Sequence, residues 1–354
     1  MSVTSHDVAR LAGVSQATVS RALRGDARVT NETQARVREA AQLLGYVRSE
    51  LGRGLSTRST HRVALVAELE NTLYHQLMAP IHDELADRGY RMVLLAEHGV
   101  QAVLHERLLD RSVDGAILMT TRLTSSLPLE LSRRDLPFVF LNRVGAFTDA
   151  SSVSANNLGG SRAAGELLIG LGHTRLGAIV GPGDTSTARD REAGFRAALD
   201  DAGIVLPRNL LIRREYDEES GRLGLQAMVD TGTPPTAIFC ANDFIAIGAL
   251  NRAMELGISI PDDLAVVGFD DIDMAGWPAF ELTTVSNPLI AMARRAAGML
   301  IDLIEQPGTT QHDVFETELV LRRTHGSSGS AVHAGDLTVS CGAVLQQTDV
   351  ATTD

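Results

Sequence analysis

The sequence predicts a small all-α head followed by a larger α/β body with parallel sheets, and three observations carry this prediction. Caps and turn residues mark three short helices within the first 45 residues. From residue 61 onward, short apolar runs alternate with segments of helical spacing, which is typical of parallel strands covered by helices on both faces. The chain has 354 residues, enough for two or three compact units.

The first two helices are predicted from their ends. Thr4 and Asp7 form a capping box ahead of the first helix, and Gly13 suits the left-handed backbone that ends it. Ser15 then caps a second helix that runs over Gln16–Leu23. A helix, a turn of about three residues containing glycine and a second helix form the helix-turn-helix arrangement.

Apolar faces should pack the head together. The third helix follows the cap Thr30, stops at Gly45 and shows one apolar face, formed by Val37, Ala41 and Leu44. The second helix should bury Val14, Val19 and Leu23. Its opposite face is then left exposed to solvent or to a partner.

The body contains seven apolar runs that we interpret as buried strands, at 63–67, 92–96, 116–119, 138–141, 176–180, 237–240 and 264–267. Helical spacing fills most of the intervals, as in Leu158–Leu171 and Arg191–Ala202. About 260 residues of this pattern exceed one sheet comfortably, so two α/β subdomains are expected.

Charge is unevenly distributed along the chain. The net charge of −12 argues against nucleic-acid binding if it is taken over the whole chain. Residues 1–60, however, hold nine arginines against five acidic residues, about +4, which leaves about −16 on the remaining 294 residues. A basic head on an acidic body concentrates the attraction for phosphates at one end.

Several other classes of protein are disfavoured. The N-terminus shows no charged-then-apolar export signal and no run approaches a membrane span, so we expect a cytoplasmic protein. Cys240 lies in an apolar run, which makes a disulfide with Cys341 improbable, and no Cys/His cluster has metal-ligand spacing, so neither metal nor cofactor is expected. No GxSxG, Walker loop or HExxH motif indicates an enzyme. Residues 325–354 are rich in Ser, Gly, Thr and Ala and are interpreted as a largely disordered tail.

The head resembles one family closely. Residues 6–30, HDVARLAGVSQATVSRALRGDARVT, resemble the DNA-binding head of the LacI/GalR repressor family. The resemblance spans roughly residues 3–324 and continues in the body through the phrases Leu171-Gly172-His173, Ala241-Asn242-Asp243, Val266-Val267-Gly268-Phe269-Asp270-Asp271 and Leu282-Thr283-Thr284-Val285. It implies a repressor with a type I periplasmic-binding-protein-like effector domain of two subdomains.

Base reading is expected from the second helix, because a helix fits the major groove. Gln16, Ala17 and Arg21 share its outward face, since positions 17 and 21 are one turn apart. Arg21 can contact guanine O6 and N7, Gln16 can pair with adenine, and the Ala17 methyl can touch thymine. The hydroxyls suited to phosphate contacts belong to Ser15, Thr18 and Ser20.

Residues 46–58 match the stretch that the family uses as a hinge helix. In that family a leucine from this helix enters the minor groove, and Leu55 stands at the matching position. The usual Pro-Asn start is Arg48-Ser49 here, and Gly52 and Gly54 would each cost about 1 kcal/mol in a helix relative to alanine. We therefore expect the hinge to be less ordered without DNA, with a plain linker as the alternative.

The body implies a cleft between two subdomains. Ligands of open parallel sheets bind outside the carboxyl ends of the strands, where Asn142, Asn242 and Asp270 are expected, and Arg191 is expected to open the helix after Gly181-Pro182-Gly183. The resemblance maps ligand residues onto Arg191, Asn242 and Asp270, and more loosely onto Tyr74, His75, Tyr216 and Asn287. Asp243 and Asp271 are interpreted as helix caps instead. This chemistry suits a carbohydrate or a nucleoside equally.

The domain boundaries follow from these interpretations. We expect a helix-turn-helix domain over 1–47, a hinge over 48–60, an effector-binding and dimerisation domain over 61–324 and the tail beyond it. The N-subdomain should comprise about 61–157 and 286–316, and the C-subdomain about 158–285 and 317–324. No terminal leucine heptads appear, so a homodimer on near-palindromic double-stranded operator DNA is expected rather than a tetramer.

Three alternatives remain at this point. A periplasmic solute-binding protein would share the α/β body but not the head, and an enzyme would require a catalytic motif. A regulator controlled by a protein co-effector would share the whole architecture. Tight binding of a sugar by the body would argue against that last alternative.

Overall fold

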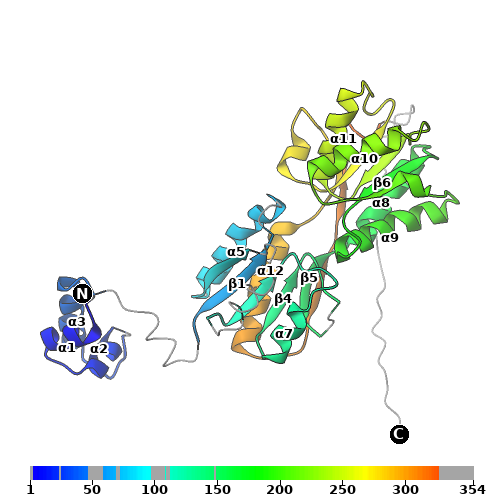
Figure 1. Cartoon of the computed structure of the whole chain (residues 1–354). Coiled ribbons are helices and arrows are strands. Elements are labelled where there is room, and N and C mark those ends of the chain that lie inside the picture. Colours follow the sequence, from blue (N-terminus) through cyan, green and yellow to red (C-terminus); the bar gives the residue numbers. More distant parts are fainter. Residues whose placement is uncertain are drawn as a thin grey trace, which may run out of the picture.

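The computed structural model describes residues 3–23, 25–46, 59–68, 72–96, 108, 112–146 and 149–326. It contains the predicted α-helical head and an α/β body built on two sheets (Figure 1). Leu55 and the rest of residues 47–58 lie outside the described residues, as do Cys341 and residues 327–354 of the predicted tail. None of the helices in the described ranges combines the length and the apolar character needed to span a membrane.

The head consists of three helices, α1 (Ser5–Ala12), α2 (Gln16–Ala22) and α3 (Asn31–Leu43). The caps are those predicted: the Thr4 backbone N–H donates to the Asp7 carboxylate at 3.0 Å, and Gly13 takes a left-handed φ of 65°. Helix α2 ends one residue earlier than predicted. Its inward face is Val19 and Ala22, whereas Val14 and Leu23 are only half-buried against the same cluster.

The first sheet of the body has the strand order β11-β5-β4-β3-β1-β2, and all its pairs are parallel. We call this sheet and its helices the N-subdomain. Its elements are β1 (Arg62–Ala67), a 3-10 turn (Thr72–Tyr74), α5 (His75–Asp87), β2 (Arg91–Ala96), β3 (Gly115–Leu118), α7 (Leu127–Arg133), β4 (Phe138–Leu141), β5 (Ser151–Ala155), α12 (Leu289–Glu305) and β11 (His312–Phe315). Helices α5 and α12 cover one face, and α7 packs with the other.

The second sheet, with its helices, is the C-subdomain and has the order β12-β10-β9-β8-β6-β7. Only β12 runs antiparallel. Its elements are α8 (Asn157–Gly170), β6 (Leu176–Val180), α9 (Ser186–Asp201), a 3-10 turn (Arg208–Leu210), β7 (Leu211–Arg213), α10 (Glu218–Val229), β8 (Ala237–Cys240), α11 (Asp243–Glu255), β9 (Ala265–Asp270), a 3-10 turn (Asp273–Gly276), β10 (Thr283–Ser286) and β12 (Glu318–Val320). Helices α8 and α9 cover one face, and α10 and α11 cover the other.

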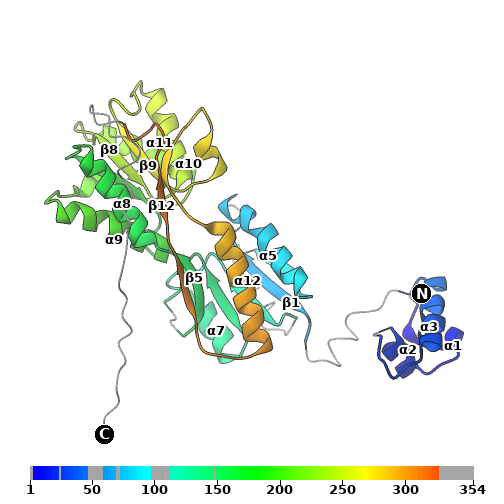
Figure 2. The same cartoon turned by 180° about the vertical axis from the view of Figure 1, so that it is seen from behind.

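Three chain segments connect the subdomains: β5 to α8, β10 to α12, and β11 to β12 (Figure 2). Each sheet is therefore assembled from stretches that are far apart in the sequence. These three crossings place the carboxyl ends of the parallel strands of both sheets near the same crease.

The predicted apolar runs all form strands, with ends shifted by at most three residues. Five strands were not predicted, namely β5, β7, β10, β11 and β12, because they are short and most carry polar or half-buried residues. One helix boundary was wrong: α9 begins at Ser186, after the cap Thr185, so Arg191 lies in its second turn rather than at its start.

Candidate functional site

The exposed face of α2 carries the residues predicted to read DNA. Gln16, Ala17 and Arg21 are exposed, and their shared face points away from the apolar cluster of the head. Thr18 and Ser20 are half-buried at its margin. An exposed helical face with an arginine and an amide side chain matches what the major groove accepts.

Several of these side chains have local partners, and the Ser15 and Thr18 hydroxyls lie 2.9 Å apart. Ser15 caps α2, because its hydroxyl accepts from the Thr18 backbone N–H at 3.1 Å. Gln16 donates from Nε2 to the Ser5 hydroxyl of α1 at 2.8 Å, so it must exchange that bond to reach a base. The remaining predicted DNA contact, Leu55, lies outside the described residues.

In the C-subdomain, Arg191 and Asp270 form a buried ion pair. Nη2 of Arg191 donates to Oδ1 of Asp270 at 2.9 Å, and each side chain is only 2% exposed. Nε of Arg191 donates to Oδ1 of Asn157 at 2.8 Å, and Nη1 donates to the carbonyl of Ala241. The guanidinium also lies 3.7 Å from the ring centroid of Phe269. Each of the three guanidinium nitrogen atoms thus donates a hydrogen bond.

Two further predicted residues lie beside this pair. Asn287 donates from Nδ2 to Oδ1 of Asp270 at 3.1 Å. Asn242 follows Ala241 directly and caps α11, its Oδ1 accepting from the Ile245 N–H at 2.9 Å. The sequence therefore identified a set of polar side chains that the fold brings together from three strand ends.

The interpretation of Asp243 and Asp271 as helix caps was wrong. Asp243 is fully buried, accepts from the Ile272 N–H at 2.9 Å and from the Thr284 hydroxyl, and so fastens β9 and β10 to α11. Burial raises the pKa of this carboxyl well above its usual value. Asp271 instead accepts from Arg322 at 2.7 Å.

A second polar group faces the crease from the N-subdomain. Asn142 directly follows β4 and is buried. Its side chain contacts the hydroxyl of Tyr74, and burial raises the pKa of this tyrosine. Arg143 follows and places its guanidinium 6.0 Å from the ring centroid of Tyr74 and 5.3 Å from that of Tyr216, which belongs to the C-subdomain. These contacts bring three of the predicted effector residues, Tyr74, Asn142 and Tyr216, close to an arginine that was not predicted.

Tyr216 connects the two groups. Its hydroxyl lies 3.1 Å from that of Thr187, which is one helical turn before Arg191 on α9. The ring of Tyr216 packs so closely on Gly181 that a Cβ there would lie 2.2 Å from the ring, so a larger residue at this position would displace the tyrosine.

Direct contacts hold the subdomains together at this crease. Arg122 of the N-subdomain pairs with Asp184 of the C-subdomain at 3.0 Å, and the Leu123 N–H donates to the Asp184 carbonyl at 2.7 Å. The Val144 N–H donates to the Ser186 hydroxyl at 2.8 Å. The residues of the two groups thus line one interface between the halves.

Two buried acceptor atoms at the crease, Oδ1 of Asn142 and Oδ1 of Asn287, have no hydrogen-bond partner among the described residues. A buried acceptor left unpaired costs about 1–3 kcal/mol, so such atoms call for a partner. Both atoms are hydrogen-bond acceptors, whereas Arg143 is a donor. A hydroxyl group can donate to the former and accept from the latter.

The backbone at these strand ends is unusual. Asn142, Asp270 and Asp271 have φ values of 68°, 106° and 52°, in a region that non-glycine residues seldom occupy. Such positions cost about 1–3 kcal/mol each and cluster at ligand sites. Two of these three positions, Asn142 and Asp270, are predicted effector residues.

Arg143, Asn157, Thr187 and Arg122 were missed by sequence reasoning. A signal existed only for Arg143, which directly follows a predicted site residue at a strand end. His75 is exposed as the first residue of α5, and no contact joins it to either polar group, so its place in the site stays a prediction.

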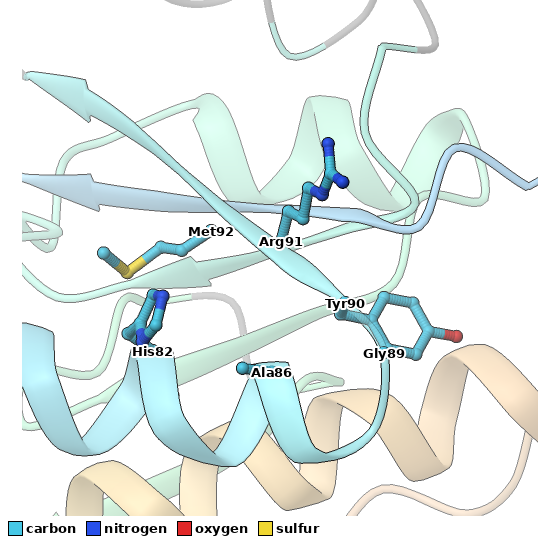
Figure 3. A pocket seen from close by; sticks show the side chains of 6 residues that line it. All are labelled: His82, Ala86, Gly89, Tyr90, Arg91 and Met92. Atoms are coloured by element: carbon cyan, nitrogen blue, oxygen red, sulfur yellow. The ribbon is translucent and has the colours of Figure 1, made fainter. Parts of the chain in front are cut away.

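A hollow of about 600 Å³ lies elsewhere, at the outer edge of the N-subdomain. It is lined by α5, the following turn and β2, with His82 and Met92 directed toward one another across it (Figure 3). None of the predicted effector residues lines this hollow.

The comparisons with known proteins agree on both parts of the chain. The family described as "Bacterial regulatory proteins, lacI family" matches residues 4–49, and the "Periplasmic binding protein-like domain" matches residues 166–325. The ribose operon repressor of Escherichia coli (strain K12) is 32% identical over 326 residues, covering 90% of this chain and 98% of that protein.

Two solved structures are similar over nearly their whole length. A complex of the transcriptional regulator CelR with cellobiose has a TM-score of 0.70 at 31% identity, covering 91% of this chain and 99% of that one. A lac repressor dimer bound to operator and the anti-inducer ONPF has a TM-score of 0.83 at 26% identity, covering 92% and 100%.

Proposed function

This chain belongs to the lacI family of bacterial regulatory proteins, and we propose that it is a dimeric repressor whose affinity for operator DNA is controlled by a small polyhydroxylated effector. It is a DNA-binding transcriptional regulator with an effector domain. The proposal adds the class of effector, the residues that bind it and the oligomeric state.

The observation that carries the proposal is the polar lining of the crease. The buried Arg191–Asp270 pair and the unpaired Oδ1 of Asn287 stand on one side, and Arg143 with the unpaired Oδ1 of Asn142 stands on the other. Carboxylate, amide and guanidinium groups of this kind fix hydroxyls in orientation. The rings of Tyr74 and Tyr216 supply flat apolar surface for the remainder of a sugar or nucleoside.

Relatives support the same class of effector. The ribose operon repressor is named for a pentose operon, and the CelR structure holds cellobiose. We assign the effector contacts to Tyr74, His75, Asn142, Arg191, Tyr216, Asn242, Asp270 and Asn287, and we add Arg143 because its guanidinium lies between the two tyrosine rings.

The DNA contacts are assigned to α2 and the hinge. Gln16, Ala17 and Arg21 are proposed to read bases, while Ser15, Thr18 and Ser20 contact phosphates and Leu55 enters the minor groove. A dimer presents two heads to two half-sites, and the similar lac repressor structure is a dimer bound to operator. We further propose that the protein acts in the cytoplasm, on the nucleoid, without a catalytic role. The proposed domains are the helix-turn-helix domain over 1–47, the hinge over 48–60 and the effector domain over 61–324.

One thermal-shift experiment tests the effector class. The full chain is heated with D-ribose, cellobiose, other neutral sugars and ribonucleosides, each at millimolar concentration, because a ligand at 100 times its Kd stabilises by about 2.7 kcal/mol. We expect one chemical group of the panel to raise Tm by several degrees. A panel without any shift would contradict the effector class.

The alternative is a protein co-effector acting on the same architecture. Selection of duplexes from random DNA by the full chain separates the two cases, since the DNA-binding function is common to both. A chain that selects a near-palindrome but ignores every sugar and nucleoside favours the co-effector.

A further inference from the structure

A single carboxylate receives the end of the linker where it enters the body. Oδ1 of Asp114 accepts from the Thr60 N–H at 2.7 Å and from the Thr60 hydroxyl at 2.8 Å. Oδ2 accepts from the Ser59 hydroxyl at 2.5 Å and from the His61 N–H at 2.8 Å. Four donors from three consecutive residues thus converge on one side chain.

These four bonds use the full capacity of the group. A carboxylate offers about four acceptor positions, and bonds to its charged oxygens are roughly twice as strong as neutral ones. Within the described ranges, no arginine or histidine forms an ion pair with Asp114. The Asp114 carboxylate therefore accepts its hydrogen bonds from residues 59–61 at the end of the linker.

Further contacts fix the direction of the chain here. His61 takes a left-handed φ of 51°, and its ring lies 5.5 Å from that of Tyr90. The His61 carbonyl accepts from the Arg91 N–H at 2.9 Å. Residue 61 is thereby bound on one side by the loop before β3 and on the other by the start of β2, which fixes the backbone at residues 59–61.

The two strands that begin at this point both reach the effector crease. β1 starts directly after His61 and leads to Glu68, whose Oε2 lies 3.8 Å from Nη1 of Arg143. Its neighbour β3 starts directly after Asp114 and leads to Thr120, whose carbonyl accepts from Arg143 at 3.5 Å. Six strand residues span roughly 20 Å. The linker anchor and the crease are thus the two ends of the same pair of strands.

We propose that Asp114 is a positioning residue that clamps residues 59–61 to the N-subdomain and so fixes where each DNA-binding head is held. The inference rests on the proposed function, because it concerns heads that meet two half-sites. The clamp removes residues 59–61 from the free length of the linker, whereas release adds these three residues, which reach at most about 10 Å.

Half-site spacing measures this placement directly. One inserted base pair moves the half-sites apart by about 3.4 Å and rotates them by about 35°. The parent should therefore discriminate between a selected operator and the same half-sites with one central insertion. Released residues 59–61 are long enough to let the heads reach the displaced half-sites. Loss of the clamp should therefore reduce the difference in affinity between the two duplexes.

The experiment compares the full-length parent with Asp114→Asn, which keeps the shape but turns an N–H group toward two of the four donors. Anisotropy titrations give the ratio of Kd values for the two duplexes, after selection of the operator from random DNA. We expect at least a tenfold ratio for the parent and a ratio at least three times smaller for Asp114→Asn. A ratio does not depend on the fraction of active protein, so partial unfolding would not imitate the effect.

Two controls complete the design. Asp87→Asn removes an exposed carboxylate from the end of α5 in the same subdomain and should leave the ratio unchanged. The double change Ser59→Ala and Thr60→Val keeps Asp114 but removes two of its four donors, so it should also lower the ratio of Kd values. This variant provides the test if Asp114→Asn does not fold. An equal ratio in parent and folded variants overturns the clamp, whereas a parent that selects no operator overturns the proposed function instead.

Discussion

The guanidinium of Arg191 donates to the carboxylate of Asp270 at 2.9 Å, and both side chains are 2% exposed. The sequence predicted both as effector residues at one crease, but not that each is the other's partner before a ligand binds. A buried charge needs such a partner, since desolvation of an isolated ion costs several kcal/mol. The pair is therefore a structural element of the C-subdomain as well as a proposed ligand site.

Asp270→Ala should consequently destabilise the body. It leaves the Arg191 charge buried without its counterion, a change that costs about 3–5 kcal/mol, and it also removes the acceptor used by Asn287. Urea unfolding of the full chain followed by circular dichroism measures the loss. A midpoint equal to that of the parent would show that the pair contributes nothing to stability.

Asp270→Asn separates the ligand role from this structural one. Its amide oxygen can still accept from Arg191 and Asn287, so Asp270→Asn should destabilise the body less than Asp270→Ala, although Arg191 loses its counterion and the charge that fixes an effector hydroxyl is lost. We expect the affinity for the sugar or nucleoside found by thermal shift to fall at least tenfold, with operator affinity in its absence within twofold of the parent. Because coupling between the two sites is reciprocal, the effect of that compound on operator binding should fall too. A normal response would remove Asp270 from the effector site.

Arg143→Met should reduce effector binding without the loss of stability expected for Asp270→Ala. Arg143 is buried like Arg191, but among the described residues it makes one long hydrogen bond, 3.5 Å to the Thr120 carbonyl, and its nearest carboxylate, that of Glu68, is 3.8 Å away. Replacement of a poorly paired buried charge by an apolar side chain of similar length is often neutral or stabilising. Unfolding midpoints should therefore stay within about 1 kcal/mol or rise, while the Tm shift caused by the effector shrinks.

Arg191→Met serves as the matched control for this prediction. It should destabilise strongly, because Asp270, Asn157 and the Ala241 carbonyl would all lose a donor. Equal destabilisation by the two substitutions would mean that Arg143 is a structural arginine and not a group reserved for a ligand.

The sequence predicted those features that depend on local signals. Caps such as Ser15 and Thr30 bond to the chain within three residues, so the head helices are correct to about one residue. Fully apolar runs identified the central strands, whereas edge strands such as β7 and β11 carry no such pattern. Positions after strand ends predicted Asp270 and Asn142, because the carboxyl ends of parallel strands converge.

The rest depends on contacts that local patterns do not encode. Asp243 looks like a cap beside Asn242, and only the pairing of β9 and β10 shows that it joins both strands to α11. Arg143 reaches Tyr216 only because the chain crosses between subdomains. Asp114 precedes a strand and lies 53–55 positions from its partners, so no spacing rule reveals the clamp.

Cys240 should be inert in the folded protein. It lies in β8 without exposure, and burial, reinforced by the nearby Asp243 carboxylate, raises the pKa of its thiol, so little thiolate exists at pH 8. In a Cys341→Ser variant, an aromatic disulfide reagent should modify Cys240 at least 100 times more slowly in buffer than in 8 M urea, as absorbance at the thiolate product would show. Rapid modification in buffer would mean that β8 opens readily.

Arg21→Ala tests the DNA-reading face of α2. Arg21 is exposed beside Ala17 and Gln16, and a bidentate contact with guanine is worth about 1–3 kcal/mol. The substitution should weaken operator binding by that amount and relax one base position in each half-site, which repeated selection from random DNA would reveal. Arg10→Ala is the matched control, because Arg10 is an 80% exposed arginine of α1 paired with Asp7, and its loss should weaken binding to all sequences alike, if at all. If Arg21→Ala keeps the parent's base preferences and affinity, α2 enters the groove with a different face.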